Sequence, residues 1–366
     1  MDDQLTNRIA KFLLGRPGNR ATESVADCAL ASGIGLVRDQ NQDAALIVKA
    51  RYGSGPDRDF DLAVVCDGLG GMQHGGEASA LALSAFVSRV VRFSRFPMDN
   101  RLMNGVVEAN DRLFGAFRGD GGTTLSAVAV GRNGSATICH VGDSRVYAIG
   151  DNIVRQLTHD DTLQAALQKK ANSTNLQRDT RLLQFVGMGT DLEAQLFQID
   201  PSGVKTYLLT SDGAHDIPLS FLQRVVHAAR SNSDLARKLV QLSEILGGFD
   251  NATAVTLPAL LPENSERPSE GLDLQLISAW GQLAIWIPQL ADEKRGAPPL
   301  PGAPVQPLPP PADNHQEFPA PVSQQKELSQ KSKRTKNSKK KKRSTSSHEL
   351  PLVEPLTIQF PPDDET

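Results

Sequence analysis

Residues 60–77 read FDLAVVCDGLGGMQHGGE, and the rest of the chain is best interpreted outward from this stretch. Its apolar first half, which runs to Cys66, predicts a strand that is buried on both faces. The strand ends at Asp67, and five of the next nine residues are glycine. A carboxylate at the end of a buried strand is unfavourable without a compensating positive charge, so we expect a bound divalent cation. The alternative at this point is an ordinary glycine-rich turn.

Composition and length favour a single folded domain followed by a different kind of segment. The chain has 366 residues, of which 39% are apolar, and the apolar deficit lies in the last seventy residues. Three widely spaced cysteines match neither a disulfide framework nor a zinc site, so we expect a reducing, cytoplasmic environment. No secretory signal opens the sequence, and no apolar stretch reaches the roughly 18 residues of a transmembrane segment.

The net charge of −3 hides a strong asymmetry along the chain. Residues 326–343 carry ten basic side chains and one acidic side chain, whereas the remainder carries 29 basic and 41 acidic side chains. The acidic body argues against a nucleic-acid-binding core. The basic run could bind weakly to an anionic surface, and the alternative is a solvated linker.

The order of predicted elements indicates an α+β fold, because a pair of strands and two helices precede a meander of short strands. Strands 195–199 and 205–210 are predicted to pair, and Ser233 is predicted to cap a helix. The predicted strands are 43–48, 60–67, 195–199, 205–210 and 252–257, with hairpin turns at 132–134 and 150–152; the predicted helices are 5–14, 77–93, 102–117, 161–170, 221–229 and 235–246.

Two more aspartates share the context of Asp67. Asp212 ends an apolar strand and is followed by glycine, and Asp250 stands just before the last strand. Carboxylate oxygens suit Mg²⁺ and Mn²⁺, and two such ions about 3.5–4 Å apart can activate a water molecule. Arg38 precedes the first strand and offers a planar fork for phosphate oxygens. No Cys/His cluster offers a zinc site as an alternative.

Seven short motifs resemble the metal-dependent serine/threonine protein phosphatases of the 2C family (PPM), in the bacterial style. They occur in the order that the family shows and cover roughly residues 25–257. The motifs are RDQNQD at 38–43, DGLGG at 67–71, GTT at 122–124, GDSR at 142–145, LTHD at 157–160, SDG at 211–213 and DNAT at 250–253.

This resemblance implies a four-layer α-β-β-α sandwich, in which two antiparallel sheets are flanked by helices and two Mg²⁺ or Mn²⁺ ions lie at one edge. Arg38 would hold the substrate phosphate, and a metal-bridging water or hydroxide would attack phosphorus in line. The implied metal-site residues are Asp67 as the bridging ligand, the Gly68 carbonyl, Asp212, Asp250, Asp43 through water, and Asp143 at a third, weaker metal.

The sequence also departs from part of the family. Leu69 stands where many animal and plant members carry a histidine that is thought to protonate the leaving alkoxide. Leucine cannot donate a proton, so metal-bound water is the expected proton source. The segment between Asp161 and Gly187 looks shorter than the usual flap, which leaves substrate specificity open.

We therefore expect an enzyme that removes phosphate from phosphoserine and phosphothreonine in proteins and so opposes a serine/threonine kinase. The alternative is a catalytically weak or inactive scaffold that binds phosphoproteins through the same fold. Residues 351–360 could be a docking peptide for a partner. The expected organisation is an N-terminal helical extension (1–24), the phosphatase domain (25–257), an added amphipathic segment (258–296), a Pro-rich linker (297–325), a Lys-rich disordered tail (326–348) and a C-terminal peptide (349–366).

Overall fold

A computed structural model describes residues 2–15, 18–53, 55–69, 74–151, 153–171, 179–261 and 268–288. The predicted linker, Lys-rich tail and C-terminal peptide lie outside these residues. Two sheets form the centre, and every strand pair in them is antiparallel. The first has the order β1-β2-β11-β10-β7-β8 and the second the order β13-β12-β3-β4-β5-β6-β9.

The strands are β1 (Arg20–Val25), β2 (Cys28–Gly33), β3 (Asp43–Tyr52), β4 (Phe60–Asp67), β5 (Leu125–Gly131), β6 (Ala136–Val141), β7 (Arg145–Ile149), β8 (Val154–Gln156), β9 (Gln195–Ile199), β10 (Thr206–Thr210), β11 (Ala252–Pro258), β12 (Leu272–Ser278) and β13 (Gly281–Ile287). The helices are α1 (Asp2–Leu14), α2 (Gly75–Arg92), α3 (Met98–Phe117), α4 (Leu163–Ala171), α5 (Asp212–His215), α6 (Leu219–Ala228) and α7 (Asn232–Ile245), with one 3-10 turn (Pro56–Arg58).

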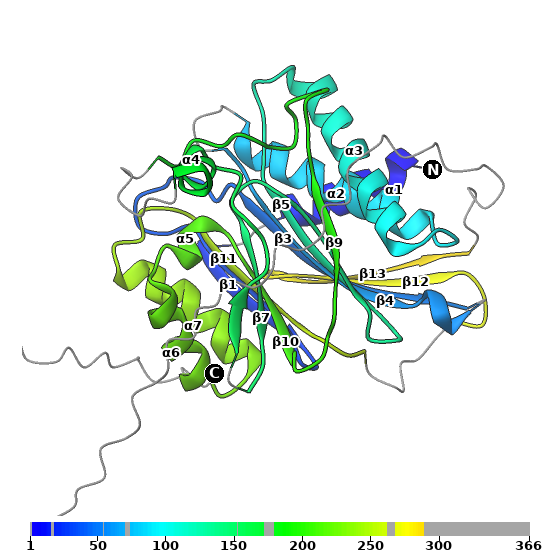
Figure 1. Ribbon diagram of the computed structural model, residues 1–366. Helices are drawn as coiled ribbons and strands as arrows, with labels where there is room; N and C mark the ends of the chain where they lie inside the picture. Colours follow the sequence, from blue (N-terminus) through cyan, green and yellow to red (C-terminus); the bar gives the residue numbers. More distant parts are fainter. Residues whose placement is uncertain are drawn as a thin grey trace, which may run out of the picture. The chain divides into compact units, whose positions relative to one another are not determined.

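Helices cover the outer face of each sheet, with α1–α3 on the seven-stranded sheet and α5–α7 on the six-stranded sheet (Figure 1). The predicted α-β-β-α sandwich is therefore confirmed. Strand β3 shows why the apolar runs are continuous: Leu46 and Val48 pack beneath the helices, while Ile47 faces the opposite sheet. Since both faces of such a strand are buried, an alternating polar pattern would leave polar groups in the core.

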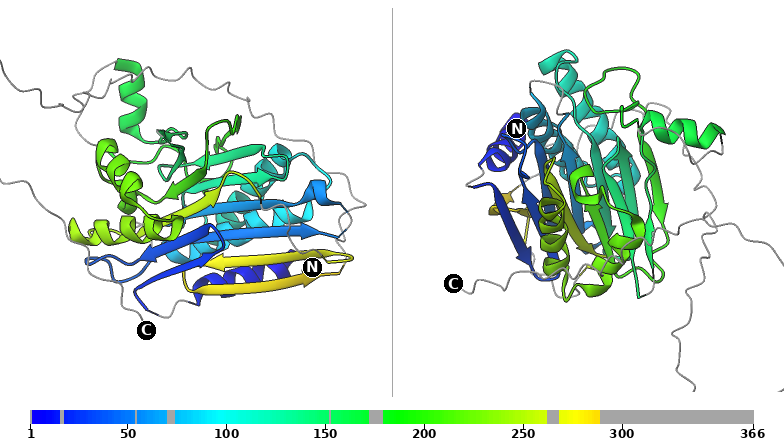
Figure 2. Two further views of the ribbon diagram at one scale, coloured as in Figure 1. Left: turned by 90° about the horizontal axis from the view of Figure 1, so that it is seen from below. Right: turned by 90° about the vertical axis from the view of Figure 1, so that its left-hand side faces the viewer.

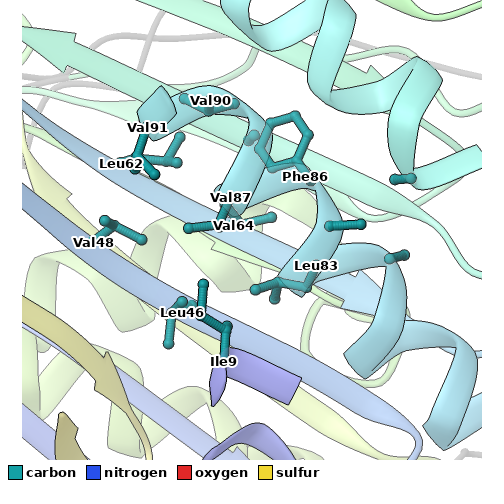
Figure 3. Close-up of a cluster of buried hydrophobic side chains, with 14 of the residues drawn as sticks. Ile9, Leu46, Val48, Leu62, Val64, Leu83, Phe86, Val87, Val90 and Val91 are labelled. Carbon is teal, nitrogen blue, oxygen red and sulfur yellow. The ribbon is translucent and has the colours of Figure 1, made fainter. Parts of the chain in front are cut away.

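The largest core cluster lies between α2 and the seven-stranded sheet. Val87 of α2 lies beside Val64 of β4, and Ile9 of α1 lies beside Leu46 of β3 (Figure 3). Phe86 and Val90 of α2 approach Gly105 of α3. Burying such side chains stabilises the fold by roughly 1.5–3 kcal/mol each. The cluster fixes β4, and through β4 it fixes the position of Asp67.

Two details of the sequence prediction are wrong. Strands β9 and β10 do not pair with each other, because β9 joins β6 in one sheet and β10 lies between β7 and β11 in the other. The connection at residues 200–205 crosses between the sheets and does not turn back as a hairpin. Helix α7 is capped by Ser231, whose hydroxyl accepts a hydrogen bond from the Asp234 amide, and not by Ser233.

The segment with both tryptophans forms a hairpin. Strand β12 pairs with β3 and β13 pairs with β12, so this hairpin extends the seven-stranded sheet (yellow in Figure 2). Leu272, Leu274 and Leu276 of β12 are buried in the cluster beneath the helices. The amphipathic character seen in the sequence thus corresponds to a strand with one face in the core.

Two glycines of α3 provide a matched test of this packing. A Cβ on Gly105 would lie 2.7 Å from the Phe86 ring, whereas a Cβ on Gly115 would meet no atom within 4 Å. We expect Gly105→Ala to lower the free energy of unfolding by about 1–3 kcal/mol through overpacking. Gly115→Ala should raise it by up to about 1 kcal/mol, because alanine favours the helix. Urea denaturation of both variants measures the difference, and equal effects would contradict this packing of α2 on α3.

Candidate active site

Five strands direct acidic residues to one edge of the two sheets. In the seven-stranded sheet, Asp67 ends β4 and lies opposite Asp43, the first residue of β3. In the six-stranded sheet, Asp212 follows β10 and Asp250 precedes β11. Asp143 precedes β7, which is the other neighbour of β10. The topology therefore gathers at one edge five aspartates that lie up to 207 positions apart in the sequence.

Close backbone approach explains two of the glycines at this edge. A Cβ on Gly213 would lie 2.1 Å from the Asn251 carbonyl oxygen, so only glycine lets the loop of Asp212 approach that of Asp250. A Cβ on Gly68 would lie 2.2 Å from the Gly75 carbonyl oxygen. The start of α2 can thus lie directly against the end of β4.

Two residues that the sequence analysis did not assign connect the sheets at the site. Ser211 Oγ donates a 2.7 Å hydrogen bond to Asp43 Oδ2. Asn251 donates through Nδ2 to the carbonyls of Ile34 and Gln40, and its Oδ1 accepts from the Gln42 amide. Asn251 therefore holds both ends of the loop that carries Arg38. The sequence could have pointed to Asn251, because it directly follows Asp250 in the DNAT motif at 250–253.

The carboxylates raise one another's pKa. Burial raises the pKa of Asp43 to about 6. Hydrogen bonds with neighbouring hydroxyl groups oppose this rise, and the charges of Asp212 and Asp250 add to it. Burial, followed by the charges of Asp43 and Asp212, raises the pKa of Asp67 well above its usual value. Burial and the charge of Asp212 raise the pKa of Asp143 to about 7. Since each group disfavours ionisation of the next, the edge has an excess of negative charge.

Two observations indicate that the aspartates at this edge suit a hard cation. Asp43 Oδ1 is buried and has no hydrogen-bond partner. Burial and the charge of Asp250 raise the pKa of Asp212, while a side-chain hydrogen bond with Asp67 opposes that rise, so these two carboxyl groups lie next to each other. A cation at this edge would satisfy the unpaired oxygen and offset the repulsion among the carboxylates.

The carboxylates do not form a closed cage. Within the described ranges, no three side chains of the types His, Cys, Asp and Glu are placed to enclose one metal ion. Mg²⁺ commonly takes one or two carboxylates and retains several waters, so a partial set of ligands suits it better than it suits zinc. Asp67, Asp143, Asp212 and Asp250 are all partly exposed, which leaves room for such waters.

Arg38 lies against this cluster. Its Nη2 donates a 2.6 Å hydrogen bond to Asp250 Oδ2, and this contact is the main reason that the pKa of Arg38 is raised. The charges of Asp212 and Asp67 act in the same direction. The guanidinium is about one-third exposed, so an incoming anion can reach it.

Leu69 stands two residues after Asp67. Its amide donates to the Gly122 carbonyl, and a Cβ on Gly122 would lie 2.8 Å from Leu69 Cδ1 and 2.6 Å from the Phe185 ring. The surroundings of Leu69 are therefore apolar. Thr123 and Thr124, from the GTT motif, hydrogen-bond the Asp67 backbone and hold the strand end in place.

Known proteins that are similar to this chain in sequence and fold include bacterial phosphatases. The chain is 27% identical over 236 residues to the serine/threonine phosphatase Stp of Listeria welshimeri, covering 60% of this chain and 91% of that protein. It is 26% identical to the protein phosphatase PhpP of Streptococcus pneumoniae, covering 66% of this chain and all of that protein. The crystal structure of the PPM Ser-Thr phosphatase MsPP from Mycobacterium smegmatis superposes with a TM-score of 0.54 and 29% identity, over 65% of this chain and all of that one.

No protein-family model matches the sequence. The named relatives and the PPM structure together support a bacterial PPM-family serine/threonine protein phosphatase, as the sequence motifs predict. They also support the predicted enzyme class, and nothing among them favours the inactive scaffold. This likeness implies dependence on metal ions. Among the described residues, no helix is long and apolar enough to cross a membrane.

A buried histidine supports the loop of Asp143. His140 Nδ1 and Ser126 Oγ are 2.8 Å apart, and Ser126 Oγ donates to the Ser144 carbonyl. His140 Nε2 lies 3.1 Å from the His159 carbonyl oxygen. Burial lowers the pKa of His140 to about 4, against the effect of the nearby Asp160 charge.

This shift predicts acid sensitivity. The folded-state pKa of about 4 lies below the ordinary value of 6.5, so the unfolded chain binds the proton first as pH falls. The contribution of His140 is complete above pH 6.5 and is lost on acidification toward pH 4, by about 1.4 kcal/mol per pH unit between these values. We expect the difference in unfolding free energy between wild type and His140→Gln to fall accordingly. Urea titrations at several pH values measure it, and a pH-independent difference would contradict the assignment.

Proposed function

We propose that the carboxylate edge binds two Mg²⁺ or Mn²⁺ ions and that the protein hydrolyses phosphoserine and phosphothreonine in other proteins there. Asp67, Asp212 and Asp250 would be direct ligands together with the Gly68 carbonyl, and Asp43 would act through water. The observation that carries this proposal is the unpaired buried oxygen of Asp43, which lies opposite Asp67 at an edge where the carboxyl groups raise one another's pKa. When bound, such ions supply an acidified water as nucleophile and positive charge for the phosphoryl oxygens.

Arg38 is the proposed phosphate-binding residue. It already donates to the oxygen of an acidic group, Asp250, and a phosphate presents the same kind of acceptor in a geometry that a guanidinium matches with two parallel hydrogen bonds. Asn251 would act as a positioning residue, because it fixes the loop on both sides of Arg38. Asp143 is proposed at a third, weaker metal.

The departing serine or threonine alkoxide needs a proton, and the Leu69 side chain cannot donate one. Leu69 Cδ1 and the Phe185 ring both lie close to Gly122, so the described surroundings of Leu69 are apolar. We therefore assign the proton donor to water held at the carboxylate edge. This assignment separates the protein from relatives that use a histidine there.

The proposal extends to the class of substrate and to the cellular compartment. The substrates would be phosphoproteins modified by a serine/threonine kinase, and the cytoplasm is the proposed compartment. The domain organisation given above, a docking role for residues 351–360 and weak anionic-surface binding by residues 326–343 remain predictions, because these segments lie wholly or partly outside the described residues.

The metal site can be tested by one isosteric substitution. Asp212→Asn keeps the shape of the side chain and removes its charge, so Mn²⁺-dependent hydrolysis of p-nitrophenyl phosphate should fall by about 100-fold or more. Asp200→Asn is the matched control, since Asp200 is exposed and follows β9 at the far end of the sheets. Mn²⁺ should raise the melting temperature of the wild type and of the control, but not that of Asp212→Asn. Full activity after exhaustive chelation would sink the proposal.

The phosphate-binding role of Arg38 calls for a charge-conserving change. Arg38→Lys retains the positive charge and loses the two-pronged hydrogen bonding, so kcat/KM for a phosphopeptide should fall by about 100-fold. Arg155→Lys, on an exposed position of β8, should leave kcat/KM unchanged. An Arg38→Lys enzyme with wild-type kcat/KM would show that the guanidinium does not bind the phosphate.

A further inference from the structure

Large apolar side chains lie exposed beside the proposed phosphate site. Leu36, Val37 and Phe249 are exposed by 69%, 60% and 73%, respectively. Val37 directly precedes Arg38, and Phe249 directly precedes Asp250, which is the ion-pair partner of Arg38. We call these three residues the apolar rim.

The exposure of the apolar rim is imposed by rigid loops. The amides of Leu36 and Val37 both donate to the Gly248 carbonyl, at 2.7 and 3.2 Å. Gly35 has a φ of +79°, and a Cβ there would lie 2.4 Å from the Asp250 carbonyl oxygen. The two loops are therefore fastened together, and their side chains cannot retreat into the core by a local rearrangement.

Leu36 lies against the loop that carries Phe249, and the Phe249 ring lies over a glycine of its own loop. A Cβ on Gly248 would lie 2.8 Å from Leu36 Cγ, and a Cβ on Gly247 would lie 2.4 Å from the Phe249 ring. Leu36 and Phe249 thus lie over neighbouring glycines. Single exposed apolar residues are ordinary, whereas an adjacent group of them marks a surface that binds something apolar.

We infer that the apolar rim binds a large apolar side chain of the phosphoprotein substrate, close in sequence to the phosphorylated serine or threonine. This inference rests on the proposed function, because it takes the phosphate to bind at Arg38. An extended peptide advances about 3.3 Å per residue, so residues one to three positions from the phosphorylated residue reach a surface adjoining Arg38. The substrate class is therefore phosphopeptides with Leu, Ile, Val or Phe within three positions of the phosphate.

Continuity with the phosphate site supports a substrate as the occupant. Val37 adjoins Arg38 in the chain, and Phe249 adjoins Asp250, the ion-pair partner of Arg38. A substrate would therefore contact Arg38 and the rim together, and discrimination between phosphoproteins could arise from this second contact.

The test compares synthetic phosphopeptides with the full-length protein. One series has glycine and serine around the phosphothreonine, and a second carries a single leucine at each position from three before to three after it. We expect leucine at one or more positions to raise kcat/KM about tenfold. In Phe249→Ser and Leu36→Ser that ratio should approach one. Leu260→Ser, at 68% exposure near the far end of the sheets, is the matched control and should keep the wild-type ratio.

The outcomes are distinguishable. No hydrolysis of any phosphopeptide by the wild type would contradict the proposed function itself. Equal kcat/KM for the leucine and glycine series would overturn the apolar rim as a substrate contact while leaving the proposed function intact. A wild-type dimer that dissociates on Phe249→Ser, with unchanged peptide preference, would overturn it too, because the rim would then bind a second copy. Circular dichroism of each variant checks that it is folded.

Discussion

Mutual repulsion among carboxylates at the shared edge of the two sheets is the constraint on which the site depends. Asp43 is buried with one oxygen unpaired, and the pKa of Asp67 rises because of burial and then because Asp43 and Asp212 lie close to it. Such an arrangement costs folding free energy unless a cation or proton compensates. A fold that keeps these groups together gains a cation-binding edge at the expense of intrinsic stability.

Packing, close backbone contacts and a hydrogen bond hold the carboxylates together against that repulsion. Asp67 ends a strand whose other residues are buried on both faces, and α2 lies against it through Gly68. On the other sheet, Gly213 allows the loops of Asp212 and Asp250 to approach within a distance that no side chain would tolerate. The hydrogen bond from Ser211 to Asp43 then joins the two sheets at the site.

Much of the fold could be predicted from the sequence, because strands such as β4 and helices such as α2 have strong local patterns. The errors concern strand partners and a helix cap, which the local sequence pattern does not determine. Nothing in residues 195–210 shows that the chain crosses from one sheet to the other, since strand partners are chosen by distant residues. Ser231 and Ser233 are equally good caps by residue type, and the turn geometry decides between them.

The acidic residues of the site were predictable because each follows or precedes an apolar strand. Ser211 and Asn251 were not assigned, because their roles are hydrogen bonds across the sheets that become visible only when the strands are paired. The apolar rim was also missed, since Leu36 and Phe249 are 213 positions apart and each looks unremarkable by itself.

The loop that Asn251 holds has two separable properties. It presents the Arg38 guanidinium to the carboxylate edge, and it presents Leu36 and Val37 to solvent. Guanidinium binding of a phosphate is the same for every phosphoprotein, so it cannot distinguish one substrate from another. An apolar contact a few residues away depends on the neighbouring sequence, and in water it is favourable only when the substrate offers apolar surface. Because both contacts are made by one rigid loop, a change in the apolar side chains can alter substrate preference without altering the geometry at Arg38.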